Sequence, residues 1–218
     1  MVTRSQFEEQ LQKLHGYLLK MGTMVEESVH NAVRSLIHKD VKLAHQVMIR
    51  DKEINQAEME IEKICLNLIA LQQPVGSDLR KIITALKVST DLERMGDHAV
   101  NIAETTIKLQ NEIYAKPLID IPKMAELVKR MIRDVLEAYI EVNQESAVKI
   151  ADKDDEVDSY YQKVFNDLVR IMNEEKMLIN QASHLLLVAQ YLERIGDYVT
   201  NICESIIYLS SGESVELN

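Results

Sequence analysis

One segment of this chain occurs twice, and the repeat constrains the fold more than any other feature of the sequence. LERMGDHAVNIAE at residues 92–104 returns as LERIGDYVTNICE at residues 192–204. The first-copy positions kept in the second copy are Leu92, Glu93, Arg94, Gly96, Asp97, Asn101, Ile102 and Glu104. Such an internal repeat indicates a duplicated chain whose two halves share one fold.

The repeated segment carries two different stripes when it is placed on a helix with 3.6 residues per turn. The polar stripe of the first copy consists of Glu93, Asp97, Asn101 and Glu104. The apolar stripe lies nearly opposite and consists of Val88, Leu92, Met95, Ala99 and Ile102. Duplicated halves both need an apolar face for packing, but packing does not require identical polar residues on the far face. The retained polar stripe therefore indicates a shared function there.

The rest of the chain has the composition of long helices, with 6 glycines, 3 prolines and no tryptophan. Apolar residues at helical spacing predict six helices, and no segment has the pattern of a strand. The predicted helices cover residues 5–37, a segment from Asp40 to about Pro74, a segment from Ser77 or Asp78 through the first repeat, residues 122–142, a segment after Asn143, and a segment from about Asn180. Asp40 and Asn143 are predicted helix N-caps.

The predicted architecture is all-α, with six helices in two three-helix bundles related by internal duplication. Pro117 and Pro122 interrupt the pattern and mark the boundary between the halves. We expect a first bundle over residues 1–115, a linker over 116–122, a second bundle over 123–210 and a polar tail over 211–218. Each bundle is expected to bury the apolar stripes of its own helices.

Charge and hydropathy exclude several classes of protein. The formal net charge of −10 argues against nucleic-acid binding, which needs a basic surface. No apolar run is long enough to cross a bilayer, and the amino terminus has no signal-peptide pattern, so we expect a cytoplasmic protein without membrane insertion. Docking on a membrane protein stays open. Cys65 and Cys203 are expected to be reduced core thiols.

Acidic pairs spaced by four residues predict a metal site in each half. Asp154 and Asp158 have the same spacing as Glu193 and Asp197, and Asp51 and Asn55 occupy the corresponding place before Glu93 and Asp97. If neighbouring helices bring these pairs together, a bound cation would relieve the repulsion between the carboxylates. Oxygen ligands favour Fe, Mn or Mg, and Zn is also compatible. The predicted metal ligands are Asp51, Glu93, Asp97, Asp154, Asp158, Glu193 and Asp197.

Gly96 and Gly196 lie inside these helices, where each costs about 1 kcal/mol relative to alanine. The close approach of a neighbouring helix would explain them, and so would room for a ligand. Tight helix packing alone explains the glycines equally well.

Two other interpretations compete with the metal site. A metal-free scaffold would use the acidic stripe as a solvated docking face, with Arg94 as a nearby ionic partner. A di-iron enzyme normally needs two Glu-x-x-His motifs, whereas this chain has only the one formed by Glu27 and His30. No Gly-rich phosphate loop or recognisable nucleophile is present, so an enzyme is not expected.

The repeated ER(I/M)GD-x-x-x-NI-x-E, the preceding DKEIN and DDEVD segments and the duplication together resemble the PhoU family. The resemblance implies a cytoplasmic, usually dimeric protein of two three-helix bundles, which acts with the phosphate ABC transporter and a membrane sensor kinase. Such a protein restrains phosphate uptake and the phosphate-starvation response when phosphate is plentiful. Multinuclear metal clusters held by E(D)xxxD pairs are also implied. Asn55 departs from this pattern, since a carboxylate is expected there, so the second bundle is expected to hold metal more firmly.

Overall fold

The computed structural model describes residues 4–217, which are almost entirely helical. Its elements are α1 (Arg4–His38), α2 (Val41–Gln72), α3 (Ser77–Lys108), α4 (Asp120–Glu141), α5 (Gln144–Ala151), α6 (Asp154–Glu174), the 3₁₀ turn η1 (Lys176–Leu178) and α7 (Ile179–Ser211). Residues 4–217 contain no strand. The predicted all-α fold of six helices in two repeats is confirmed, and the fifth predicted helix is divided into α5 and α6.

The division between α5 and α6 falls at Asp152 and Lys153. Lys153 reaches across to α4, where its ammonium donates to Asp134 Oδ2 over 2.6 Å. Neither proline nor glycine occurs at the break, so the sequence had no signal for it. As a result, α6 begins at Asp154, a residue predicted to bind metal.

The turns that open the second helix of each repeat are built alike. Asp40 accepts a hydrogen bond from the Leu43 backbone N–H over 3.0 Å, and Asn143 accepts one from the Ser146 N–H over 3.0 Å. Both predicted N-caps are thereby confirmed. The residue before each cap has a left-handed backbone, with φ of 54° at Lys39 and 51° at Val142.

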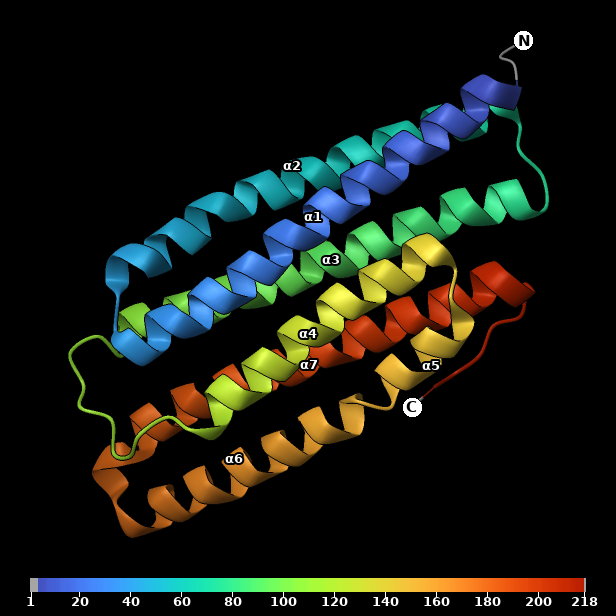
Figure 1. The fold of residues 1–218 in the computed structure, drawn as a ribbon. Coiled ribbons are helices and arrows are strands. Elements are labelled where there is room, and N and C mark those ends of the chain that lie inside the picture. The colour runs from blue at the N-terminus through green and yellow to red at the C-terminus, as the bar shows by residue number, and fades with distance from the viewer. Residues whose placement is uncertain (1–3, 218) are drawn as a thin grey trace.

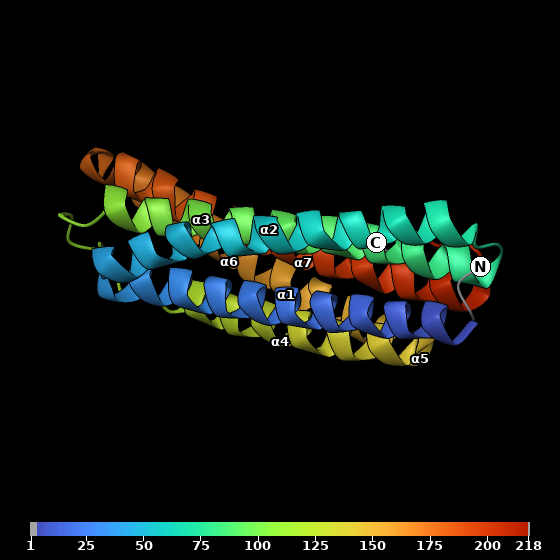
Figure 2. The same cartoon turned by 90° about the horizontal axis from the view of Figure 1, so that it is seen from above.

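The two bundles lie side by side, with α1, α2 and α3 in one and α4 to α7 in the other (Figure 1). Their helices follow a common long axis (Figure 2). α3 packs against α7 and α1 packs against α4, so the buried apolar side chains form one continuous core across both repeats. In addition to the apolar stripes buried within each bundle, each bundle therefore has an apolar edge that faces the other.

α3 and α7 run antiparallel at the centre of the molecule. The Lys87 ammonium lies 5.7 Å from the Tyr208 ring centroid, and further along α3 the His98 ring stacks on Tyr191 at 5.5 Å. His98 also stacks on Tyr198, its own counterpart in the second repeat, at 5.8 Å. Because equivalent residues touch, the approximate two-fold axis relating the repeats passes close to this pair.

Two further sequence expectations have structural counterparts. Within residues 4–217, no helix combines the length and the apolar character needed to span a bilayer. Cys65 and Cys203 are both free and buried, as predicted for core thiols. The polar segment after α7 contacts that helix, because the Leu217 N–H donates to Glu204 Oε1 over 3.0 Å. Asn218 lies outside the described residues.

Candidate functional site

The first acidic cluster consists of Asp51 and Asn55 on α2 with Glu93 and Asp97 on α3. α2 and α3 pack against each other, and the apolar stripe of α3, from Val88 to Ile102, is fully buried as predicted. The opposite stripe of α3 is consequently left at the surface beside α2. Asn55 Nδ2 donates to Asp51 Oδ2 over 3.3 Å, and the charge of Asp97 acts on both Asp51 and Glu93. The structure therefore brings together the four residues that the sequence pattern paired.

The second acidic cluster consists of Asp154 and Asp158 on α6 with Glu193 and Asp197 on α7. Asp154 is only 5% exposed and accepts a hydrogen bond from Thr200 Oγ1 over 3.4 Å. Asp158 is exposed, and its charge acts on Glu193 and Asp197. The duplicated stripe thus faces two carboxylates, Asp154 and Asp158, in the second repeat, and one carboxylate and one amide, Asp51 and Asn55, in the first.

Both retained glycines lie against the neighbouring helix, and Gly196 makes room for the first acid of its cluster. A Cβ added at Gly196 would overlap Asp154 Oδ1, and it would lie 3.4 Å from Val157 Cγ1. A Cβ at Gly96 would lie 3.4 Å from Asp51 Oδ1 and 3.2 Å from Ile54 Cδ1. The glycines therefore mark the close approach of a carboxylate side chain from the neighbouring helix, and this contact is tighter in the second repeat.

Burial and mutual repulsion shape the electrostatics of both clusters. Burial raises the pKa of Asp51, and the nearby Asp97 raises it further. Burial likewise raises the pKa of Glu93 and of Glu193, with Asp97 and Asp197 as the next causes. The pKa of Asp197 is raised by burial and by Asp158, although Arg194 opposes the rise. Carboxylates held together in this way attract protons and cations.

The oxygen atoms of the two clusters are chemically suited to bind a metal ion, but their positions fit one only partly. All the cluster ligands are oxygens, and Asp51 Oδ1 is buried without a hydrogen-bond donor among the described residues. However, no group of three or more His, Cys, Asp or Glu side chains in residues 4–217 is arranged to hold a metal ion. The side chains would have to rotate toward one another for the clusters to bind a cation.

Glu58 is a fourth acid beside the first cluster, and it is not among the residues predicted from the sequence. Its charge contributes to the raised pKa of Glu93, and it accepts a hydrogen bond from Thr90 Oγ1 over 3.0 Å. Glu58 follows Asp51 and Asn55 on the same face of α2, at the i, i+4, i+7 spacing, so the helical pattern contained the signal. The equivalent position in the second repeat is Tyr161. The comparison of the two repeats therefore did not reveal this acid.

Asp91 is a second acid that the repeat could not reveal, because its counterpart is Tyr191. It lies in α3 on the side of α7 and is 8% exposed. Burial raises the pKa of Asp91 to about 6, although Arg94 and Lys87 oppose the rise. Arg94 Nη1 is 3.9 Å from Asp91 Oδ1. Arg94 is therefore an ionic partner of Asp91 as well as a neighbour of the polar stripe.

The single Glu-x-x-His motif does not assemble into a ligand set. Glu27 pairs with Arg50 of α2 over 3.2 Å, whereas His30 Nδ1 lies 3.5 Å from Glu126 of α4. The two side chains contact different neighbouring helices.

The fold and the two clusters define a class of tandem-repeat helical proteins with an acidic cluster in each repeat. A family profile described as the PhoU domain matches this chain twice, over residues 18–106 and 121–206. The chain therefore belongs to the PhoU family, whose members are accessory and regulatory proteins rather than enzymes.

Individual relatives match this chain over all or nearly all of its length. The chain is 44% identical over 218 residues to the phosphate-specific transport system accessory protein PhoU homolog of Clostridium acetobutylicum, with 100% of both chains covered. A crystal structure of the phosphate transport system regulatory protein PhoU from Streptococcus pneumoniae superposes with a TM-score of 0.91 at 34% identity, covering 97% of this chain and 100% of that one. PhoU from Pseudomonas aeruginosa gives a TM-score of 0.91 at 36% identity, covering 95% and 100%.

Proposed function

We propose that this protein restrains the high-affinity phosphate ABC transporter and the phosphate-starvation signalling pathway when phosphate is plentiful. The supporting observation is the full-length similarity, at 44% identity, to a phosphate-specific transport system accessory protein. Its partners would be the transporter subunits and a membrane sensor kinase, engaged from the cytoplasm. A cytoplasmic location agrees with Cys65 and Cys203, which are free thiols typical of reducing compartments.

Phosphate uptake tests the regulatory role. Cells without this chain and the same cells with it restored would be compared in phosphate-rich medium, with radiolabelled phosphate as the tracer. We expect faster uptake in the absence of the chain and a return to the original rate on restoration. Equal uptake rates in the two strains would refute a role in restraining transport.

Metal binding is a further part of the proposal. The second acidic cluster would hold Fe, Mn or Zn through Asp154, Asp158, Glu193 and Asp197, and the first through Asp51, Glu93 and Asp97. A metal there would neutralise the crowded carboxylates and join neighbouring helices. The second cluster is expected to bind more firmly, because the amide of Asn55 donates to Asp51 instead of offering a second carboxylate.

Elemental analysis of protein purified without chelator tests this expectation. Asp197→Ala should remove more metal than Asp97→Ala, and Glu145→Ala, an exposed acid paired with Lys149, serves as the control. Equal losses from the two cluster variants would contradict the difference between the repeats.

A metal-free scaffold is the second candidate, supported by the absence of a converged ligand group among residues 4–217. In this case the exposed Asp97 and Asp158 would contact basic loops of a partner directly. Protein that contains no metal yet still restrains uptake would favour the scaffold over the metal site.

We also expect a homodimer. Outward-facing apolar side chains on α2 support it: Ile49, Met59, Leu66 and Leu71 are 66%, 62%, 55% and 74% exposed. Light scattering of the purified chain measures the mass directly, and a monomer at micromolar concentration would contradict this expectation.

A further inference from the structure

A groove lies between α1 and α4, at the end of the molecule where α1 finishes and α4 begins. Its volume is about 360 Å³. Its apolar walls include Val33, Ile37 and Pro122, and its polar lining includes His30, Arg34 and His38. We call it the α1–α4 groove. It is separate from both acidic clusters, which lie along α2, α3, α6 and α7.

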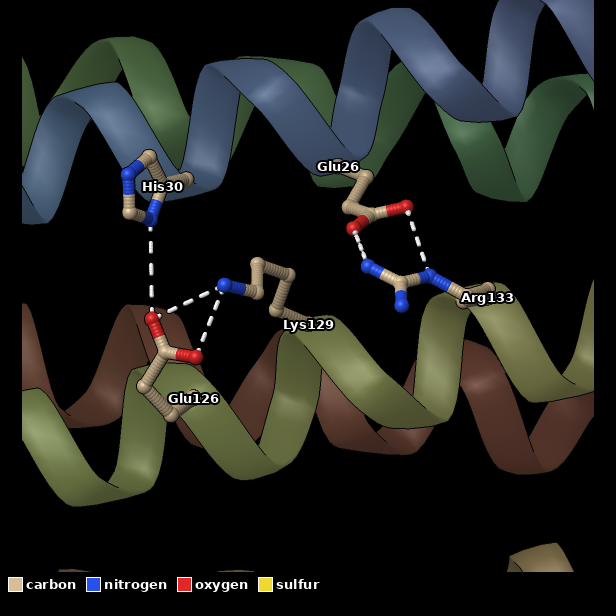
Figure 3. A network of polar contacts seen from close by, with 5 residues as sticks. All are labelled: Glu26, His30, Glu126, Lys129 and Arg133. Atoms are coloured by element: carbon tan, nitrogen blue, oxygen red, sulfur yellow. Dashed lines mark hydrogen bonds and ion pairs between the residues drawn. The ribbon is translucent and has the colours of Figure 1, made fainter.

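The groove contains an arginine and a histidine that pair with nothing in the described chain. Arg34 and His38 are exposed, and no hydrogen bond or ion pair joins either of them to another residue within 4–217. The one acid that lines the groove, Glu126, is already shared between His30 at 3.5 Å and Lys129 at 2.7 Å (Figure 3). An unpaired arginine beside an apolar wall is notable in a chain with 35 acids and 25 basic residues.

The second repeat shows that these charges are not required by the fold. At the offset of 103 that relates α1 to α4, the counterparts of Arg34 and His38 are Glu137 and Glu141. The α1–α4 contact continues along the molecule through the pair formed by Glu26 and Arg133 (Figure 3). The two ends of this contact therefore carry different side chains at equivalent positions, Arg34 and His38 at one end and Glu137 and Glu141 at the other.

We propose that the α1–α4 groove binds an acidic segment of a partner protein, with an apolar side chain of that segment held against Ile37 and Pro122. The carboxylates of the segment would form an ion pair with Arg34 and accept a hydrogen bond from the His38 imidazole, two side chains without partners among the described residues. Ile37 is 37% exposed, and burying it adds an apolar contribution that a simple anion would not supply. Glu126 at the edge disfavours free anions in the groove, so the apolar contact is needed for binding.

Fluorescence anisotropy with a defined probe tests the proposal at low salt. The probe is a short labelled peptide in which leucines separate runs of glutamate, and a matched peptide has serine in place of each leucine. Arg34→Glu/His38→Glu gives the first repeat the charges of the second and should weaken binding of the leucine peptide by about tenfold or more. The matched control, Glu137→Gln/Glu141→Gln, should stay within about twofold of the original chain.

Both variants alter exposed residues, and circular dichroism melting would show that each keeps its fold. The serine peptide should bind at least about fivefold more weakly than the leucine peptide, because it lacks the apolar anchor. Three outcomes would overturn the proposal: no binding of the leucine peptide, equal binding by the Arg34→Glu/His38→Glu chain, or equal binding of the two peptides. The last would indicate a general anion site instead.

Discussion

Replacing Gly196 with alanine is the most direct test of how the second acidic cluster is built. The new Cβ would overlap Asp154 Oδ1, and Asp154 is 5% exposed in the interface between α6 and α7. The carboxylate would have to move away, and it would lose its 3.4 Å hydrogen bond from Thr200. Backbone strain does not enter, because Gly196 is an ordinary helical residue.

The size of the effect follows from two opposing contributions. Alanine stabilises a helix interior by about 1 kcal/mol relative to glycine. Forcing extra volume into a packed interface costs about 1–3 kcal/mol, and the loss of the Thr200 hydrogen bond adds about 1 kcal/mol. We therefore expect Gly196→Ala to lower the free energy of unfolding by about 1–3 kcal/mol, a fall in Tm of about 2–12 °C for a chain of this size.

Gly96→Ala is the matched control. Its new Cβ would lie 3.2 Å from the flexible end of Ile54 and 3.4 Å from Asp51 Oδ1, which are contacts that small shifts can relieve. The gain in helix propensity and the cost of these shifts should nearly cancel. The expected change in the free energy of unfolding is about zero.

Urea unfolding followed by circular dichroism measures both variants. An Asp154→Ala background supplies the second control, because removing the carboxylate removes the overlap. In that background Gly196→Ala should stabilise the protein. The reasoning is refuted if the two glycine variants are equally stable, or if the Gly196→Ala penalty persists without Asp154.

Three further predictions concern buried and half-buried side chains outside the proposed ligand set. Burial, with a smaller effect from a nearby lysine, lowers the pKa of His15, so the unfolded chain binds more protons and stability is lost as the pH falls through 6.5 toward the folded-state pKa. His15→Gln should therefore reduce the fall in urea midpoint between pH 7.5 and pH 5.5, whereas His45→Gln, at an exposed position, should not. Burial raises the pKa of both Cys65 and Cys203 to about 12, so a thiol reagent at pH 8 should react with the native chain about a thousandfold more slowly than with the unfolded chain. Equal rates would contradict their burial. The Tyr139 hydroxyl is buried without a hydrogen-bond partner among the described residues, and Tyr139→Phe should leave the free energy of unfolding unchanged or raise it by about 1 kcal/mol; a loss above about 1 kcal/mol would reveal a hidden partner.

Local patterns predicted the helices and the acidic pairs well. Asp40 and Asn143 act as N-caps because a cap involves only the first turn of its own helix. The burial of the Val88 to Ile102 stripe was predictable because helical periodicity assigns residues to faces. The metal ligands and the domain boundaries remain predictions, since neither is tested by the geometry of the chain.

Other features depend on contacts between distant segments. Glu58 and Asp91 lacked counterparts in the second repeat, so the comparison of repeats could not find them. The break between α5 and α6 has no local signal, and Lys153 is held there by Asp134 of α4. The unpaired state of Arg34 likewise follows from which acids α4 places beside α1.

The sequence by itself determined that this is a duplicated helical protein with an acidic stripe in each half, because periodicity, capping and repetition are properties of neighbouring residues. Only the tertiary structure decided what the retained glycines accommodate, that the bundles share one core through α3 and α7, and that Arg34 lines a groove between α1 and α4. These outcomes depend on which helix lies against which, and that choice is made by packing the whole chain at once.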